Sequence, residues 1–137
     1  MTNFDFKVLA DFDWYVAISR GGLAPAYRLA QLTGVKSIDT FVAYSYDDKT
    51  HEPGQMQYLA KDYSHLKGKR VLLIDDLVDR GATMEFAMQT LAEFGLADLK
   101  NFVVYKKAHS TVNPDFYVKE TPSDEWIEFS NNLEDLF

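Results

Sequence analysis

The chain of 137 residues contains no cysteine, few basic residues and no long apolar run. Without cysteine it can form no disulfide and no thiolate metal site, and it can use no cysteine nucleophile. Lys and Arg number 14 against 21 Asp and Glu, which gives a formal net charge of −7. Because so acidic a surface repels the phosphate backbone of nucleic acids, we expect no nucleic-acid partner.

No apolar stretch approaches the roughly 20 residues that span a bilayer, and the first residues are acidic where a signal peptide is basic. We therefore expect a cytoplasmic protein with no membrane partner. Hydrophobic residues make up 47% and charged residues 26%, as in ordinary globular proteins. Since no repeat and no Pro/Gly-rich linker divides the chain, we predict one domain over residues 1–137.

Short apolar runs alternate with helical patterns along the chain. The strand-like runs cover residues 15–18, 41–44, 71–74, 102–105 and 116–118, and the helical patterns cover 23–32 and 84–94. Polar, turn-rich stretches lie at 45–57 and 108–115. This alternation predicts an α/β fold with a parallel sheet flanked by helices. In such sheets, ligands bind at the carboxyl ends of the strands.

The most informative segment is the acidic stretch that follows the third strand-like run. We expect this strand to end at Ile74, directly before Asp75 and Asp76, and a helix to begin around Thr83. The turn over 79–83 contains a glycine and leads into a helix N-terminus, which suits a phosphate group. Carboxylates nearby can accept hydrogen bonds from sugar hydroxyls or hold Mg²⁺. The segment therefore favours a phosphorylated sugar, and the alternative is an ordinary helix start with solvated acids.

Two other motifs can be tested on the same residues. The order DDxxD in 75–79 matches the magnesium cluster of prenyl-diphosphate synthases, but that motif lies on a long helix and here it follows a strand-like run. The chain contains no GxxxxGK[ST], which excludes a P-loop. His51, His65 and His109 lack the spacing of a metal triad.

Three segments together resemble the type I phosphoribosyltransferases. Residues 74–83 resemble the signature that binds 5-phosphoribosyl 1-diphosphate (PRPP), and residues 19–25 resemble the pyrophosphate loop of the xanthine-guanine branch of that family. Ser45 and Tyr46 resemble the start of the mobile active-site loop of that branch. Lys107 and residues 124–128 resemble its 6-oxopurine-binding hood, which would be a small C-terminal hood around residues 107–137.

The resemblance implies an enzyme that transfers the 5-phosphoribosyl group from PRPP to guanine, xanthine or hypoxanthine, as in purine salvage. It implies Mg²⁺ as cofactor, with Asp76 in the metal shell, and a homodimer or higher homo-oligomer. Asp79 takes the general acid/base position beside the purine. The substrate-binding residues that it implies are Arg20, Gly21, Asp75, Asp76, Arg80, Gly81, Ala82, Thr83, Lys107, Trp126 and Ile127.

The implied roles divide the site between the two substrates. Residues 79–83 would hold the 5′-phosphate, Arg20 and Gly21 the pyrophosphate, and Asp75 with Asp76 the ribose hydroxyls. Lys107 would donate to O6 of the base, although the adjacent Lys106 could take this role. Trp126 would stack on the purine, and the backbone of Ile127 would meet its 2-substituent.

The chain departs from the family pattern at three places. Arg80 stands where Thr or Ser is usual, only about a dozen residues precede the first strand, and Ser130, Asn131 and Asn132 replace the expected Pro-Trp. Two other functions therefore stay open. One is a non-catalytic, PRPP-binding regulatory protein, and the other is a phosphoribosyltransferase for a non-purine acceptor.

Overall fold

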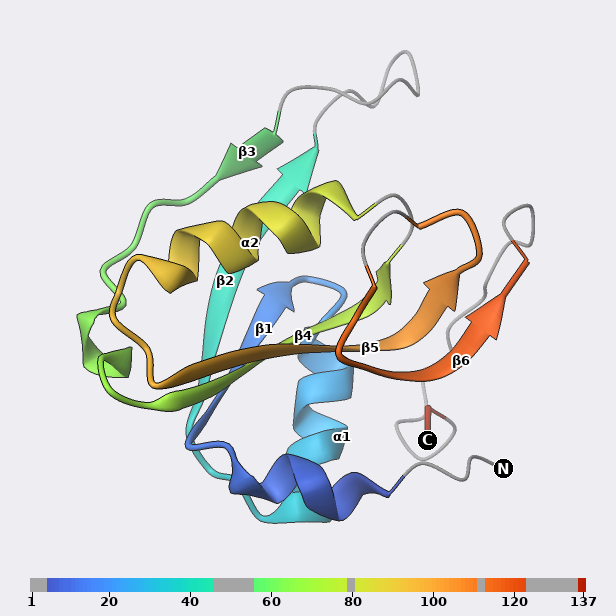
Figure 1. Cartoon of the computed structure of the whole chain (residues 1–137), viewed down its shortest axis with the longest axis horizontal. Coiled ribbons are helices and arrows are strands. Elements are labelled where there is room, and N and C mark those ends of the chain that lie inside the picture. Colours follow the sequence, from blue (N-terminus) through green and yellow to red (C-terminus); the bar gives the residue numbers. More distant parts are fainter. Residues whose placement is uncertain (1–4, 46–55, 79–80, 111–112, 123–135) are drawn as a thin grey trace.

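The computed structural model describes residues 5–45, 56–78, 81–110, 113–122 and 136–137. Its strands are β1 (Trp14–Ser19), β2 (Ile38–Ser45), β3 (Met56–Tyr58), β4 (Arg70–Val78), β5 (Asp98–Lys107) and β6 (Phe116–Thr121). Its α-helices are α1 (Leu23–Thr33) and α2 (Ala82–Ala92), and its 3₁₀ helices are η1 (Phe6–Asp11) and η2 (Ser64–Leu66). Figure 1 shows these elements along the chain.

The six strands form one sheet in the order β3-β2-β1-β4-β5-β6 (Figure 1). All neighbouring pairs are parallel except β2 and β3, which are antiparallel. The α/β prediction is confirmed, with the correction that the sheet is mixed rather than wholly parallel. The strand β3 was missed because its three residues begin inside the polar stretch 45–57 and are too few to show a periodicity.

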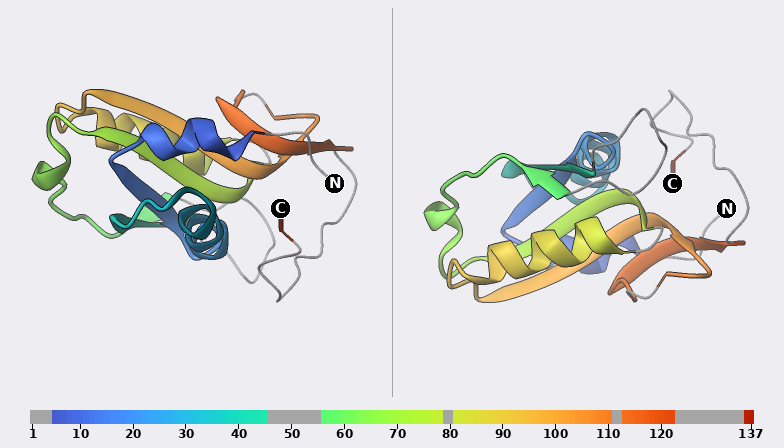
Figure 2. Two further views of the ribbon diagram at one scale, coloured as in Figure 1. Left: turned by 90° about the horizontal axis from the view of Figure 1, so that it is seen from below. Right: turned by 90° about the horizontal axis from the view of Figure 1, so that it is seen from above.

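The sheet is covered on both faces, as the continuous apolar strands predicted. Figure 2 shows α1 and α2 on opposite sides of the sheet. Met84, Ala87 and Leu91 of α2 pack on one face, and Leu9 of η1 with Leu29 of α1 packs on the other. Each strand of the centre is therefore buried on both sides, and its carboxyl end is the part left for a ligand.

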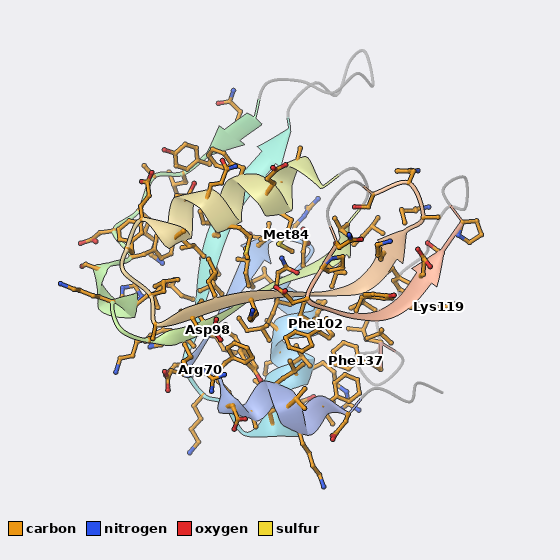
Figure 3. All side chains as sticks on the ribbon, viewed as in Figure 1. Arg70, Met84, Asp98, Phe102, Lys119 and Phe137 are labelled. Carbon is orange, nitrogen blue, oxygen red and sulfur yellow. The ribbon has the colours of Figure 1, made fainter. Side chains whose placement is uncertain are left out.

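The N-terminal residues cover the sheet although they are few. The 3₁₀ helix η1 precedes β1, and its Leu9 carbonyl accepts a hydrogen bond of 2.7 Å from the buried Tyr15 hydroxyl. Phe137 joins the same face, with its ring 5.0 Å from that of Phe6 and 5.8 Å from that of Phe102 (Figure 3). Phe6 and Phe137 therefore meet over one core.

The connection between the parallel strands β5 and β6 differs from a helical crossover. Strands β5 and β6 lie side by side and are joined by residues 108–115, too short a segment for a helix (Figure 1). Asn101 and Asp115 tie the start of β6 to β5 by reciprocal backbone-to-side-chain hydrogen bonds of 2.9 and 2.8 Å. None of the helices in the described ranges is long and apolar enough to cross a membrane.

Candidate active site

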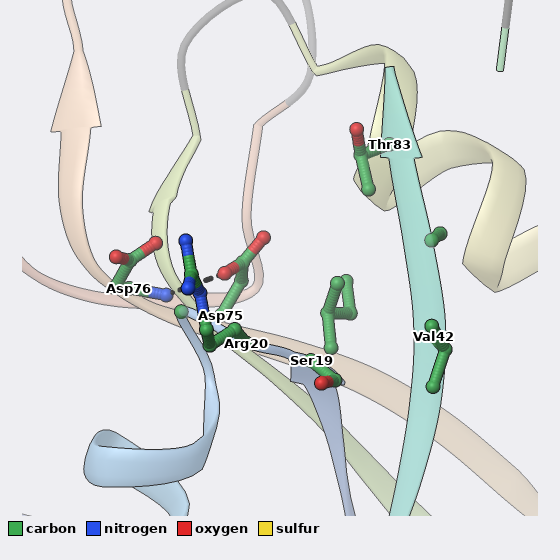
Figure 4. A pocket seen from close by; sticks show the side chains of 9 residues that line it. Ser19, Arg20, Val42, Asp75, Asp76 and Thr83 are labelled. Atoms are coloured by element: carbon green, nitrogen blue, oxygen red, sulfur yellow. Dashed lines mark hydrogen bonds between the residues drawn. The ribbon is translucent and has the colours of Figure 1, made fainter. Parts of the chain in front are cut away.

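A cavity of about 640 Å³ opens at the carboxyl ends of β1, β2 and β4, where the fold predicts a ligand. It is lined by Ile18, Ser19, Arg20, Gly21, Val42, Ala43, Asp75, Asp76 and Thr83. Figure 4 shows Arg20 beside the two aspartates, with Thr83 across the cavity from them. Five of the residues that the sequence analysis selected therefore meet in one place.

The loop after β1 brings backbone, rather than side chains, close to the sheet. A β-carbon on Gly22 would lie 2.2 Å from the Ile74 carbonyl oxygen, and one on Gly21 would lie 2.6 Å from Oδ1 of Asp76. The peptide bond between Ser19 and Arg20 is cis. The Arg20 side chain is exposed and forms no hydrogen bond or ion pair with the described part of the chain. Since it also lines the cavity, this side chain can bind an anion there.

The two acids lie on a strand, which corrects the expectation that the strand ends at Ile74. Strand β4 continues to Val78, because the backbone of Asp75, Leu77 and Val78 still pairs with β5. The side chains of Asp75 and Asp76 are half-buried, and the Asp76 amide donates a hydrogen bond of 2.8 Å to Oδ1 of Asp75. Regular pairing thus holds both carboxylates at the floor of the cavity.

Burial raises the pKa of Asp75 well above its ordinary value, and the neighbouring charge of Asp76 adds to the effect. Two carboxylates this close repel each other, so the cavity favours a bound cation between or beside them. No three His, Asp or Glu side chains gather into a metal cluster in the described residues. The pair fits Mg²⁺ nevertheless, because this ion is commonly held by one or two carboxylates together with phosphates of the substrate.

The start of α2 supplies the donors for a phosphate. Gly81, with a φ of 96°, occupies the position before the helix, and no side chain of the described residues caps the first turn. The backbone N–H groups of that turn are therefore available to an anion. Gly81 is buried, Ala82 is exposed, and the half-buried Thr83 reaches the cavity. Asp79 and Arg80 lie outside the described residues.

Of the residues predicted to read the base, the structure describes Lys107, and this residue does not line the cavity. Lys107 ends β5, is 6% exposed and is not among the residues that line the cavity. Its side chain forms no ion pair or hydrogen bond within the described residues. Lys106 donates a hydrogen bond of 3.0 Å to Glu120 instead. Trp126 and Ile127 lie outside the described residues, as do Tyr46 and most of the stretch after Ser45.

Sequence reasoning missed the contribution of β2. Val42 and Ala43 line the cavity because β2 is parallel to β1, with Val42 paired to Ser19. Both residues are apolar and look like ordinary core positions in the sequence. The one available signal was their place at the end of a strand-like run that is followed by a polar stretch.

Residues 10–137 match the family described as "Phosphoribosyl transferase domain". This chain belongs to the phosphoribosyltransferase family of enzymes. It is 38% identical over 120 residues to the xanthine-guanine phosphoribosyltransferase of Chromohalobacter salexigens, a match that covers 87% of this chain and 68% of that protein. The corresponding enzyme of Idiomarina loihiensis is 32% identical over 114 residues, with coverage of 83% and 67%.

Solved phosphoribosyltransferase structures share the fold of this chain. The purine phosphoribosyltransferase of Pyrococcus horikoshii superposes with a TM-score of 0.73 at 25% identity, and the match covers 93% of this chain and 88% of that one. The xanthine-guanine-hypoxanthine phosphoribosyltransferase of Helicobacter pylori gives a TM-score of 0.69 at 22% identity, over 87% and 75% of the two chains. The resemblance found in the sequence is thereby confirmed at the level of family and fold.

Proposed function

We propose that this phosphoribosyltransferase transfers the 5-phosphoribosyl group of PRPP to a 6-oxopurine base and releases pyrophosphate. The observation that carries the proposal is the cavity itself. It joins a basic, glycine-containing loop, two adjacent carboxylates and the uncapped start of a helix. These three parts match the pyrophosphate, the ribose hydroxyls and the 5′-phosphate of PRPP.

Each part of the cavity would act on a different charge of the substrate. The N–H groups at the start of α2 and the Thr83 hydroxyl would donate to the 5′-phosphate. Arg20 and the backbone at Gly21 would bind the pyrophosphate, on which negative charge grows as the glycosidic bond breaks. Asp75 and Asp76 would accept hydrogen bonds from the ribose hydroxyls and stabilise the positive charge that develops on the sugar ring. Asp76 would also hold Mg²⁺, and this ion, when bound, would neutralise negative charge on the departing pyrophosphate.

The base would bind beyond the carboxyl end of β4. Val78, the last residue of this strand, pairs with Lys106, so Lys107 lies one residue beyond the end of β4. We propose that Lys107 donates to O6 of the base and that Asp79 exchanges a proton with the purine as general acid/base. Trp126 would stack on the base and Ile127 would contact its 2-substituent.

Two features favour a 6-oxopurine over other acceptors. The Lys107 ammonium, which has no acceptor among the described residues, would find one in O6 but not in the amino group of adenine. The two curated relatives are both named xanthine-guanine phosphoribosyltransferases. We further propose that residues 1–137 form one domain and that the enzyme acts as a homodimer or a larger homo-oligomer.

A steady-state assay tests the proposal. The enzyme is incubated with PRPP, Mg²⁺ and guanine, xanthine, hypoxanthine or adenine in turn, and nucleotide formation is followed. Turnover of the oxopurines with adenine rejected is the expected result. Binding of PRPP in calorimetry without turnover of any of these bases would contradict the proposal. That result would favour a non-catalytic regulatory protein. If pyrophosphate were released only with another acceptor, the result would favour a phosphoribosyltransferase for a non-purine acceptor.

A further inference from the structure

The last residue of β6, Thr121, carries a buried hydroxyl without a partner. The residue is 4% exposed, and its Oγ1 forms no hydrogen bond in the described part of the chain. Buried polar groups are nearly always hydrogen-bonded, because the loss of water is otherwise uncompensated. The unpartnered hydroxyl of Thr121 lies at the carboxyl end of a strand, which is where sheets of this kind bind ligands. A role in ligand binding can therefore account for it.

The nearest neighbour of Thr121 across the sheet is Lys107. The two residues are direct register partners in the parallel pair β5 and β6, and the Ala108 amide donates to the Thr121 carbonyl at 2.9 Å. Register partners project their side chains from the same face, on strands about 4.8 Å apart. A buried hydroxyl thus lies beside the largely buried side chain of Lys107, and neither group has a hydrogen-bond partner among the described residues.

The opposite face of the same two strands is arranged differently. There Lys106 and Glu120 are register partners, and the lysine ammonium is held by the glutamate carboxylate at 3.0 Å. A carboxylate would also neutralise Lys107 and keep it from a ligand. A hydroxyl leaves the charge intact and can still accept one hydrogen bond. The pair Lys107 and Thr121 is therefore suited to a lysine that must be directed and yet remain available.

We propose that Thr121 is a positioning residue for Lys107. When the base occupies the site, Oγ1 of Thr121 accepts one N–H of the Lys107 ammonium, and the other two N–H groups remain for O6 of the base. This contact restricts a flexible side chain to the rotamer that reads the base, and so lowers the entropy lost on binding. The inference rests on the proposed function, which gives Lys107 its role.

The test compares Thr121→Val, which removes the hydroxyl and keeps the volume, with Thr121→Ser, which keeps the hydroxyl. In Thr121→Val, kcat/KM for hypoxanthine is expected to fall by about tenfold, as for the loss of a hydrogen bond to a charged group, while KM for PRPP stays the same. Thr121→Ser is expected to keep most of the wild-type value. Glu120→Gln, which alters the other face of the same strands, is the matched control and should leave both constants unchanged.

Thermal melting separates positioning from a structural role. Thr121→Val removes an unpartnered buried hydroxyl, so its Tm should equal or exceed that of the wild type. If the role of Thr121 were structural, Thr121→Val would instead lower Tm and weaken the binding of PRPP and of the base together. Should Thr121→Val fail to fold, Thr121→Ala takes its place in the same comparison.

A double-mutant cycle with Lys107→Met decides whether the threonine acts through the lysine. The effect of Thr121→Val on kcat/KM for hypoxanthine should disappear in the Lys107→Met background. An equal loss in both backgrounds, or no loss in the wild type, would overturn the inference while leaving the proposed function in place. Absence of oxopurine turnover by the wild-type enzyme would overturn the proposed function and this inference with it.

Discussion

The carboxylate of Asp76 occupies the space that a β-carbon on Gly21 would fill. The distance from that ideal β-carbon to Oδ1 of Asp76 would be 2.6 Å, which is too short for any contact between these atoms. The loop after β1 and the acidic strand β4 therefore fit closely together because Gly21, 55 positions before Asp76, has no side chain. Gly21 is thus required by its neighbour rather than by an unusual φ angle.

Gly21→Ala should weaken substrate binding more than it weakens the fold. The added methyl group must displace the Asp76 carboxylate, so we expect a clear loss of affinity for PRPP with Mg²⁺ in calorimetry and a modest fall in Tm. Gly22→Ala places its methyl group 2.2 Å from the Ile74 carbonyl oxygen, which is backbone and cannot turn away. That variant should lose at least about 2 kcal/mol of folding free energy.

Gly34→Ala serves as the control for these two substitutions. Gly34 has a φ of 80° and nothing within 4 Å of an added β-carbon, so only backbone strain of about 1–2 kcal/mol is expected. Its affinity for PRPP should match that of the wild type. Wild-type PRPP affinity in Gly21→Ala would contradict the role given to the contact between Gly21 and Asp76.

Lys107 and Lys106 should differ in their effect on the base. Lys107→Met is expected to lower kcat/KM for guanine and hypoxanthine by about 10–100-fold, because it removes a charged hydrogen-bond donor. Lys106→Met, which loses only the contact with the exposed Glu120, should change kcat/KM little. Equal losses in both variants, or a larger loss in Lys106→Met, would contradict the assignment of Lys107 as the residue that binds the base.

Asp79→Asn should separate binding from catalysis. A general acid/base of this kind contributes about 10²–10⁴ in rate, so kcat should fall within that range while calorimetry still detects PRPP binding. The control is Glu85→Gln, which removes an exposed acid from the first turn of α2. Undiminished turnover of Asp79→Asn would remove this residue from the mechanism.

The raised pKa of Asp75 predicts that this side chain destabilises the ligand-free fold at neutral pH. Because the folded protein holds the proton more tightly than the unfolded chain, stability falls as pH rises from about 4, the ordinary pKa, to the raised value. Asp75→Asn should therefore have a higher Tm than the wild type at pH 7, and the two curves should converge near pH 4. A lower Tm for the variant at pH 7 would contradict the prediction.

Asp39 should show the opposite dependence on pH. Burial alone raises the pKa of Asp39, but hydrogen bonds from Lys61, the Thr40 amide and His65 outweigh it, so that the pKa is lowered. This contribution to stability is present above the ordinary pKa of about 3.9 and is lost as pH falls through the lowered value.

Asp39→Asn should accordingly cost about 1–3 kcal/mol at pH 7, and its stability relative to the wild type should recover on acidification. Chemical denaturation across the pH range measures this difference. Glu93→Gln, which removes an exposed acid without an ion pair in the described residues, should show no such trend. A pH-independent difference between Asp39→Asn and the wild type would show that the charge of Asp39 is not the cause.

The strands and helices were predictable where apolar residues follow a regular pattern. The predicted ranges of strand β1 and of helix α1, which ends at Thr33 before Gly34, were close to the observed bounds, and the burial of both faces of β4 was also predicted. The extension of β4 through Asp75 and Asp76 was not predictable, because backbone pairing with β5 holds these residues whatever their side chains are. The strand β3 depends in the same way on β2.

The sequence by itself determined the family and the class of fold, and it predicted the parts of the site that lie within one motif. Residues 74–83 carry their chemistry in consecutive positions, so their meaning does not depend on distant segments. Only the tertiary structure decided how separate segments meet. The fit of Gly21 to Asp76, the place of Val42 in the cavity and the pairing of Lys107 with Thr121 all depend on which strands lie side by side. Strand order and register result from long-range packing, and no local pattern of residues encodes them.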